Sequence, residues 1–230
     1  MKRATLDALL AAAAAKRAVV LATDLATGEE RLVDPFGAAG EDAEVAAAAR
    51  EAASRDEARR VERAGGAVFL RPFNPPVRVV IVGAVHVSQA LARMVQLAGH
   101  EVVVVDPRRA FATAERFPGV RVVAAWPDEA FAAEGGLDRR TAVVTLTHDP
   151  KIDDPALAAA LRSEAFYVGA LGSKKTHAAR LARLRAEGFD EAALARIHAP
   201  VGMPIGAVSP GEIAASVVAQ VIGALRRPQA

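Results

Sequence analysis

Runs of small apolar residues alternate with helix-like segments over the second two thirds of the chain. Short apolar strands between amphipathic segments are typical of a parallel sheet that is covered on both faces. Strands are expected at residues 78–82, 101–105, 120–124, 141–146 and 165–168, and helices near residues 87–98, 109–116, 128–133, 154–162, 174–187, 190–196 and 210–226. Since crossovers between parallel strands are right-handed, this pattern predicts an α/β, doubly wound parallel sheet, which is a Rossmann-like fold.

The beginning of the chain shows a different pattern of strands joined through glycine turns. Helices are expected at residues 3–16 and 41–54, and strands at residues 18–23, 29–33, 58–62 and 67–73, with turns at Thr27-Gly28 and Gly65-Gly66. Asn74-Pro75-Pro76 then interrupts both periodicities. We therefore expect a small N-terminal α+β domain at residues 1–73 and a Rossmann-like domain at residues 77–230.

The composition narrows the class of protein. The chain is 52% hydrophobic and only 4% aromatic, which suits helices packed on a parallel sheet. Its net charge is +2 and no aromatic-studded basic stripe is present, so nucleic acid is not an expected partner. No apolar segment reaches membrane-spanning length, and a cytoplasmic protein is expected. The absence of cysteine excludes disulfides, thiolate metal sites and cysteine nucleophiles from these residues.

A glycine turn follows the first strand of the Rossmann-like region. Gly83 permits the tight turn, and the next helix, which opens near His86, presents free backbone N–H groups to an anion. Dinucleotide-binding loops carry a second glycine where backbone approaches the pyrophosphate, and Val85 occupies that position here. The sequence thus retains the pattern of the fold but lacks the second glycine that is typical of ordinary NAD binding.

The second strand of this region ends in an acid. Asp106 lies 23 residues after Gly83, close to the spacing of the acid that binds an adenine ribose. Arg108 and Arg109 follow it and suit a phosphate group. The alternatives are an aspartate that caps the next helix and two solvated surface arginines.

A second glycine loop follows the fifth strand. Gly169 and Gly172 expose backbone amides, Ser173 suits a helix N-cap, and Lys174 and Lys175 open the helix. Lysines at a helix start oppose the macrodipole, so a bound anion would relieve a local cost. A plain glycine turn with a serine cap is the alternative. The spacing fits neither a Walker A loop nor a nucleophile elbow, which argues against ATPase and serine hydrolase activity.

The fourth strand ends in Thr147-His148-Asp149. The histidine and the aspartate could form an acid–base pair or contact a ligand. Convergence of His148 with His86 and His198 on a metal is not favoured, because nothing in the sequence brings them together, and no metal site is expected.

Three further motifs have structural interpretations. Asp154 before Pro155 indicates a helix N-cap with proline at the first helical position. Ser209 and Glu212 form a capping box, and Trp126 is expected to be a packing residue.

The strand-end motifs together resemble a known family. The stretches that carry the resemblance are Phe73 to Val87, Asp106-Pro107-Arg108, Arg116-Phe117-Pro118, Leu146 to Asp149, Phe166 to Ser173 and Ile197 to Gly202. They are similar to the C-terminal half of XdhC/CoxI proteins, which are accessory proteins of xanthine dehydrogenase and related molybdenum hydroxylases. The resemblance covers roughly residues 73–225. Two features depart from the family, namely Val85 and the absence of the cysteine-containing motif that many members carry in their N-terminal half.

The resemblance implies a maturation factor that binds molybdenum cofactor and assists its insertion into a molybdenum hydroxylase apo-enzyme. It also implies a link to sulfuration of the cofactor by a sulfurtransferase partner, although a chain without cysteine cannot hold sulfur on a thiol. No catalytic residue is required of such a cofactor chaperone. The residues expected to line the cofactor site are Gly83, His86, Asp106, Arg108, Thr147, His148, Asp149, Gly169, Gly172 and Ser173.

Two other functions stay open at this point. An NAD(P)-dependent oxidoreductase would use His148 as its proton donor, but the side chain of Val85 would occupy the space of the pyrophosphate. An adaptor domain without a small ligand would instead have a tight protein partner. The N-terminal region could pack on the Rossmann domain, form a homodimer contact or grip the target enzyme, and the sequence does not choose among these.

Overall fold

The computed structural model describes residues 1–37, 40–63 and 66–226. The chain divides into two compact units, one formed by residues 1–75 together with the chain from Leu225 onward, and the other by Pro76–Ala224. In the described parts of the chain, no helix has both the length and the apolar character that crossing a membrane demands.

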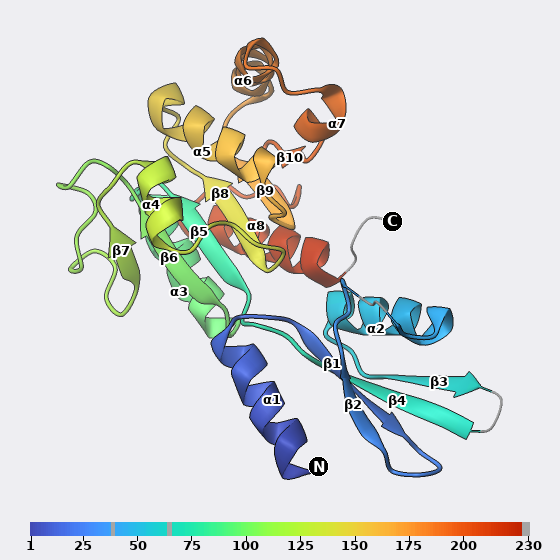
Figure 1. Ribbon diagram of the computed structural model, residues 1–230. Coiled ribbons are helices and arrows are strands. Elements are labelled where there is room, and N and C mark those ends of the chain that lie inside the picture. Colours follow the sequence, from blue (N-terminus) through green and yellow to red (C-terminus); the bar gives the residue numbers. More distant parts are fainter. Residues whose placement is uncertain (38–39, 64–65, 227–230) are drawn as a thin grey trace. The chain divides into compact units, whose positions relative to one another are not determined.

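The larger unit contains a six-stranded parallel sheet (Figure 1). In spatial order its strands are β10 (Ile197–His198), β9 (Tyr167–Ala170), β8 (Thr141–Thr145), β5 (Arg78–Val82), β6 (Glu101–Val105) and β7 (Arg121–Val123). When the strands are numbered along the chain from β5 and the sheet is read from β7 to β10, this is the order 3-2-1-4-5-6 of nucleotide-binding Rossmann folds. The expectation of a doubly wound parallel sheet is confirmed.

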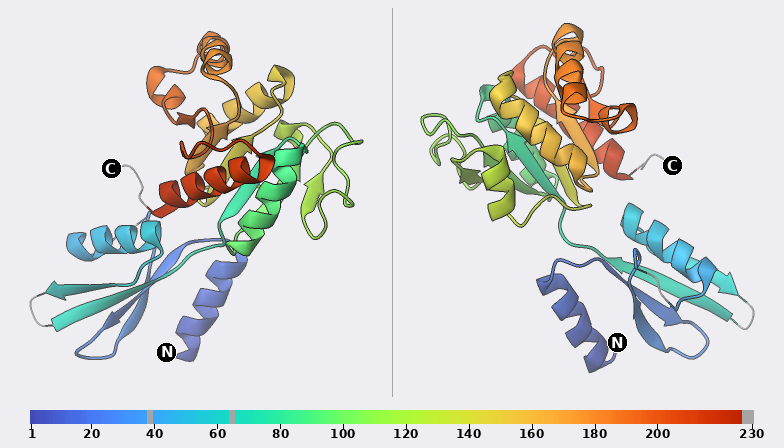
Figure 2. Two further views of the ribbon diagram at one scale, coloured as in Figure 1. Left: turned by 180° about the vertical axis from the view of Figure 1, so that it is seen from behind. Right: turned by 45° about the horizontal axis from the view of Figure 1, so that its top comes forward.

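Helices cover both faces of this sheet (Figure 2). They are α3 (His86–Leu97), α4 (Pro127–Ala133), α5 (Pro150–Arg162), α6 (Lys174–Ala186), α7 (Glu191–Leu194) and α8 (Pro210–Arg226). Since successive strand residues face opposite sides, Val80 and Val143 pack with α4 and α5, whereas Ile81 and Val144 pack with α3 and α8. The near-continuous valine runs of the central strands therefore serve two apolar layers.

The smaller unit is an antiparallel sheet with helices, as expected for an α+β domain. Its strands lie in the order β2 (Glu30–Val33), β1 (Val19–Asp24), β4 (Gly66–Phe73) and β3 (Arg59–Arg63), so the two expected hairpins join into one sheet. Helix α2 (Ala43–Arg55) packs on one face through Val45 and Ala49, and α1 (Arg3–Ala14) contacts Val19 through Leu9. Half of the expected Gly65-Gly66 turn lies outside the described residues.

The structure corrects two expected helices. Residues 109–116 form turns rather than a helix, and Arg116 Nη1 donates a hydrogen bond to the carbonyl of Phe111 over 2.9 Å within this loop. Helix α5 begins at Pro150, four residues before the expected start. Its N-cap is Asp149, whose Oδ1 accepts from the amide of Lys151 at 2.9 Å, and Pro155 lies inside the helix.

The structure agrees with the predictions for the two serine caps but not with the prediction for the tryptophan. Trp126, expected to be a packing residue, is the N-cap residue of α4 and is 46% exposed, so it is not part of the buried core. The capping box of α8 is confirmed, because the Ser209 amide donates to Glu212 Oε2 at 2.8 Å and the Glu212 amide donates to Ser209 Oγ at 3.3 Å. Ser173 is the N-cap of α6 as expected.

Candidate functional site

The carboxyl ends of β5 and β8 define the place where a Rossmann sheet binds its ligand. These two strands are neighbours at the point where the strand order reverses. Gly83, directly after β5, has φ +110°, and a Cβ on it would lie 2.5 Å from Cγ2 of Thr147, which follows β8. Only glycine fits such an approach at a positive φ, so Gly83 lets the two strand-end loops touch.

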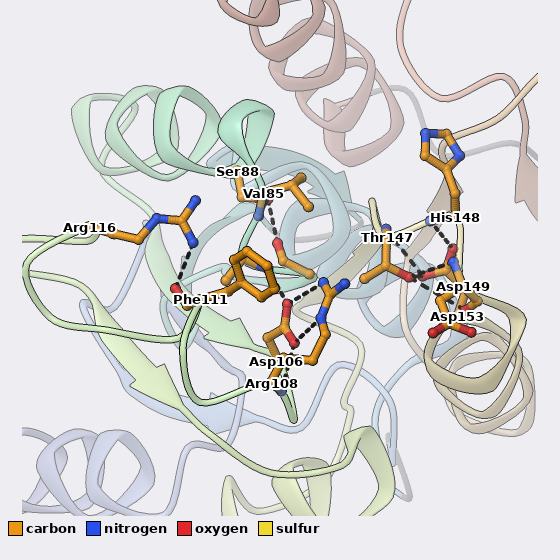
Figure 3. Close-up of polar contacts among 12 residues, drawn as sticks. Val85, Ser88, Asp106, Arg108, Phe111, Arg116, Thr147, His148, Asp149 and Asp153 are labelled. Carbon is orange, nitrogen blue, oxygen red and sulfur yellow. Dashed lines mark hydrogen bonds and ion pairs between the residues drawn. The ribbon is translucent and has the colours of Figure 1, made fainter.

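The first glycine loop is closed by its own hydrogen bonds (Figure 3). The amide of Ala84 donates to Asp106 Oδ2 at 2.7 Å, and the amide of Val85 donates to Ser88 Oγ at 3.3 Å. The hydroxyl of Ser88 in turn donates to the carbonyl of Gly83. Two backbone donors between the strand and α3 are thus already used, so they do not face a pyrophosphate in this structure.

Asp106 is the buried anchor of that closed loop. Its carboxylate is fully buried and accepts from the Ala84 amide and from the Arg108 amide, Nε and Nη2, over 2.7 to 2.9 Å. Burial alone would raise the pKa of Asp106, but the hydrogen bonds from Arg108 and Ala84 outweigh it and the pKa is lowered. All four acceptor positions are used. In this structure the carboxylate is thus engaged by Arg108 and Ala84, and a ribose would compete with Arg108 for it.

An exposed aromatic ring lies beside this anchor. The guanidinium of Arg108 stacks over the Phe111 ring at 4.8 Å, and that of Arg116 lies 5.6 Å from the same ring. Phe111 remains 45% exposed. Arg108 is thus both an ion-pair partner of Asp106 and one side of a cation–aromatic contact with Phe111.

The side chain of Asp153 holds the loop after β8 in place. Its Oδ1 accepts from Thr147 Oγ1 at 2.7 Å and its Oδ2 accepts from the His148 amide at 3.1 Å. Asp153 is 1% exposed, and burial raises its pKa despite the hydrogen bonds from Thr147 and the charge of Arg180. Sequence reasoning misses this role, because Asp153 directly precedes Asp154, the expected cap of a helix that in fact starts at Pro150.

His148 and Asp149 do not form an acid–base pair. His148 has φ +65°, an uncommon backbone conformation for a residue with a side chain, and its side chain is exposed. Figure 3 shows the imidazole pointing away from the carboxylates of Asp149 and Asp153. Asp149 instead caps α5. His148 thus projects at the edge of the site, held in place by its backbone.

The second glycine loop divides into a structural half and an open half. Gly169 lies inside β9, where a Cβ would come within 2.7 Å of Val201 Cγ2 and 2.8 Å of the Tyr167 hydroxyl, so close packing requires glycine here. Gly172 has φ +142° and precedes the N-cap Ser173, whose Oγ accepts from the Thr176 amide at 3.2 Å.

The open half presents a helix start to the solvent. Ser173, Lys174 and Lys175 are exposed, and the first amides of a helix have no partner within it. The amides of Lys174 and Lys175 therefore have no partner within α6, whereas the amides of Ala84 and Val85 in the first loop are bonded.

The histidines lie in different surroundings. His86 is exposed at the first position of α3. The ring of His198 stacks on Tyr167 at 4.8 Å, and burial lowers the pKa of His198. Across the described ranges, no group of three or more His, Asp or Glu side chains is arranged to hold a metal ion.

Fold and site together define a Rossmann-type domain whose first glycine loop is closed by hydrogen bonds and whose second leads into an exposed helix start. Residues 79–221 match the family model of the XdhC Rossmann domain, and the chain belongs to this family, which confirms the resemblance. The chain is 35% identical over 161 residues to the uncharacterized protein YqeB of Escherichia coli K12, covering 69% of this chain and 29% of YqeB.

Two further relatives have names that point to molybdenum enzymes. The molybdenum cofactor insertion chaperone PaoD of Escherichia coli K12 is 33% identical over 149 residues, with 65% of this chain and 40% of PaoD covered. A protein of Bacillus subtilis 168, named as a probable subunit of xanthine dehydrogenase, is 30% identical over 161 residues, with 70% of this chain and 46% of the relative covered. The chain thus spans less than half the length of these curated relatives.

A solved structure supports the fold. A crystal structure described as a xanthine dehydrogenase from Bacillus halodurans has a TM-score of 0.68 to this chain at 24% identity, and the match covers 99% of this chain and 65% of the other. At this identity the likeness shows a shared fold.

Proposed function

We propose that the chain binds molybdenum cofactor and assists its insertion into a molybdenum hydroxylase of the xanthine dehydrogenase type. One observation carries the proposal: of the two glycine loops at the carboxyl edge of the sheet, one is closed by its own hydrogen bonds and the other leads into an exposed helix start. The amides of Ala84 and Val85 are bound to Asp106 and Ser88, whereas the start of α6 at Ser173 presents free donors. Membership of the XdhC family and the similarity to PaoD support this cargo over a nicotinamide dinucleotide.

The donor set at α6 fits the organic part of that cofactor. Molybdenum cofactor carries a pterin and a phosphate, often extended by a nucleotide. Backbone amides at a helix start, the hydroxyl of Ser173 and the ammonium groups of Lys174 and Lys175 are phosphate-binding groups. These 230 residues contain no cysteine, so they offer the molybdenum no thiolate. We therefore expect the chain to hold the cofactor through its phosphate and pterin.

In this proposal the residues of the chain need only bind the cofactor, shield it from solvent and release it. His148 projects at the rim, held by the bond between its amide and Asp153 Oδ2 at 3.1 Å, and can contact a ligand without rearrangement of its loop. Release requires only that the apo-enzyme bind the cofactor more tightly than the chain does, because binding equilibria then drive the transfer. Sulfuration, where it occurs, would come from a partner that acts on the held cofactor, since this chain has no thiol to carry sulfur.

Anaerobic loading tests the proposal. The purified 230-residue chain is incubated with molybdenum cofactor and separated by gel filtration, and the oxidised pterin in the protein peak is measured by fluorescence. We expect stoichiometric pterin with the natural chain. Loss of one hydrogen bond to a charged group in Ser173→Ala should weaken retention by roughly tenfold.

Ser209→Ala is the matched control for this variant. Ser209 is also an exposed helix N-cap in the larger unit, so both variants remove one cap, but only Ser173 borders the glycine loop. Equal loss of pterin in both variants, or no pterin with the natural chain, would contradict the proposal.

An NAD(P)-dependent oxidoreductase is the second candidate, and the Rossmann strand order favours it. It requires a pyrophosphate to displace the bonds of Ala84 and Val85. Binding of NADPH or NADH at micromolar concentration by the natural chain, with redox turnover, would replace the proposed function with this one.

A further inference from the structure

Arg180 is a buried cation whose hydrogen-bonding groups are largely unused. It lies in the second turn of α6 and is 2% exposed. Its Nη2 donates to the carbonyl of Leu171 at 2.9 Å, so the side chain runs back to the loop that precedes α6. Neither Nε nor Nη1 has a partner among the described residues. A buried guanidinium with two idle nitrogens is costly, because buried polar groups are normally hydrogen-bonded.

The nearest carboxylate compensates this cation incompletely. Asp153 Oδ2 lies 3.8 Å from Arg180 Nη2, which is an ion pair beyond hydrogen-bonding distance. Both oxygens of Asp153 are already bonded to the Thr147–His148 segment. Consistent with this, burial lowers the pKa of Arg180 and raises that of Asp153. The pair therefore leaves the positive charge under-neutralised.

The guanidinium lies directly behind the open glycine loop. A Cβ built on Gly172 would be 3.2 Å from Thr176 Cβ and 3.8 Å from Arg180 Nη2, so the cation lies close to the backbone of the loop. The same loop leads into Lys174 and Lys175, whose charges oppose the dipole of α6. His177 in the first turns of α6 also has a buried nitrogen, Nδ1, without a partner among the described residues. Positive charge and buried nitrogens without a partner among the described residues thus gather at this end of α6.

We propose that residues 171–176 together with Arg180 form a binding site for a phosphate group. The phosphate is bound by the first amides of α6, by Ser173 Oγ and by the lysines, and Arg180 supplies a fixed buried charge behind Gly172. This inference deepens the proposed function, in which the phosphate is that of the cofactor. It also gives Asp153 a second role, because one carboxylate positions both the His148 loop and the cation of the phosphate site.

Titration calorimetry with inorganic phosphate and with inorganic pyrophosphate tests the site on the whole chain. We expect one binding event per chain, and tighter binding of pyrophosphate if the natural ligand is a dinucleotide form with two linked phosphates. Arg180→Met and the charge reversal Lys175→Glu should each weaken binding by about tenfold or more, the loss expected when one charged hydrogen bond or ion pair to a phosphate is removed. Lys175 is exposed, so its variant tests the site even if Arg180→Met does not fold.

Lys151→Glu is the matched control. Lys151 is an exposed lysine in the first turn of α5, where Asp149 already caps the helix, so its reversal should leave phosphate binding within about twofold of the natural chain. No binding of either anion by the natural chain, or an equal loss in Lys151→Glu and Lys175→Glu, would overturn the site.

The loading experiment separates this inference from the proposed function. Pyrophosphate binding without retention of cofactor would keep the phosphate site and refute the cargo. Retention of cofactor by a chain that binds neither anion would keep the cargo and refute the phosphate site.

Discussion

Replacing Asp106 with asparagine removes the charge that closes the first glycine loop. The carboxylate accepts four hydrogen bonds, and asparagine keeps one acceptor oxygen while its amide group opposes donors of Arg108 or Ala84. Two of the four bonds are lost, and each bond to a charged group contributes about 1.5–3 kcal/mol. Since the Arg108 side chain is 37% exposed, water offsets part of its loss. We therefore expect the free energy of unfolding to fall by about 2–3 kcal/mol.

The single tryptophan makes this loss measurable in the larger unit alone. Trp126 lies within Pro76–Ala224, so its fluorescence follows the unfolding of that unit in urea. With a urea slope of about 2 kcal/mol per molar, the midpoint should fall by about 1–1.5 M. Asp128→Asn, at an exposed position in the first turn of α4, is the control and should shift the midpoint by less than about 0.5 M. An unchanged midpoint in Asp106→Asn, with loss of cofactor retention, would refute the assignment of Asp106 as a loop anchor. It would instead indicate that Asp106 contacts the ligand.

The same geometry makes three further predictions. Val85→Gly alone should not create NADH affinity, because the amide at this position still bonds to Ser88; micromolar binding in a calorimetric titration would contradict this. Gly169→Ala should lower the free energy of unfolding in urea by about 1–3 kcal/mol through overpacking against Val201 and Tyr167, and an unchanged midpoint would argue against that packing. Burial raises the pKa of Asp153 in the folded chain, so the folded state binds this proton more tightly. Its contribution to stability is therefore present below the unfolded pKa of about 3.9 and is lost as the pH rises through the raised value. Asp153→Asn should remove this slope from urea midpoints measured between about pH 4 and 7, and identical slopes in the two proteins would contradict the buried carboxylate.

The regular parts of the fold follow from local patterns. The strands β5, β6 and β8 were predicted closely because their valine runs are buried on both faces, which leaves no other stable place for them. The caps Ser173 and Ser209 were predicted because capping depends on residues three or four apart. Neither feature needs knowledge of distant contacts.

The errors arose where distant contacts override local propensity. The segment 109–116 has a helix-forming composition, yet Arg108 and Arg116 instead stack on Phe111 and the chain forms turns. The expected start of α5 failed because Asp149-Pro150 carries the same capping signal as Asp154-Pro155. The upstream signal prevailed, and the buried Asp154 instead forms an ion pair with the partly exposed Arg183.

For the same reason, only part of the site could be predicted from the sequence. Gly83 and Gly172 could be found because positive φ angles at strand ends favour glycine. Ser88 and Asp153 act through hydrogen bonds to loops, and the sequence did not single them out. Arg180 did carry a signal, since it lies four residues before the buried Leu184 on the face of α6 that packs inward. A lone arginine on such a face indicates a buried charge with a partner to be found.

Competition between pyrophosphate and molybdenum cofactor tests the central claim most directly. The chain is loaded anaerobically with cofactor at increasing concentrations of inorganic pyrophosphate, and the pterin that elutes with the protein is measured. If the start of α6 with Arg180 holds the cofactor's phosphate, pterin should be stoichiometric without pyrophosphate and should fall progressively as pyrophosphate saturates the chain. Pterin that stays stoichiometric on a chain saturated with pyrophosphate would contradict the account, because the cofactor would then bind elsewhere.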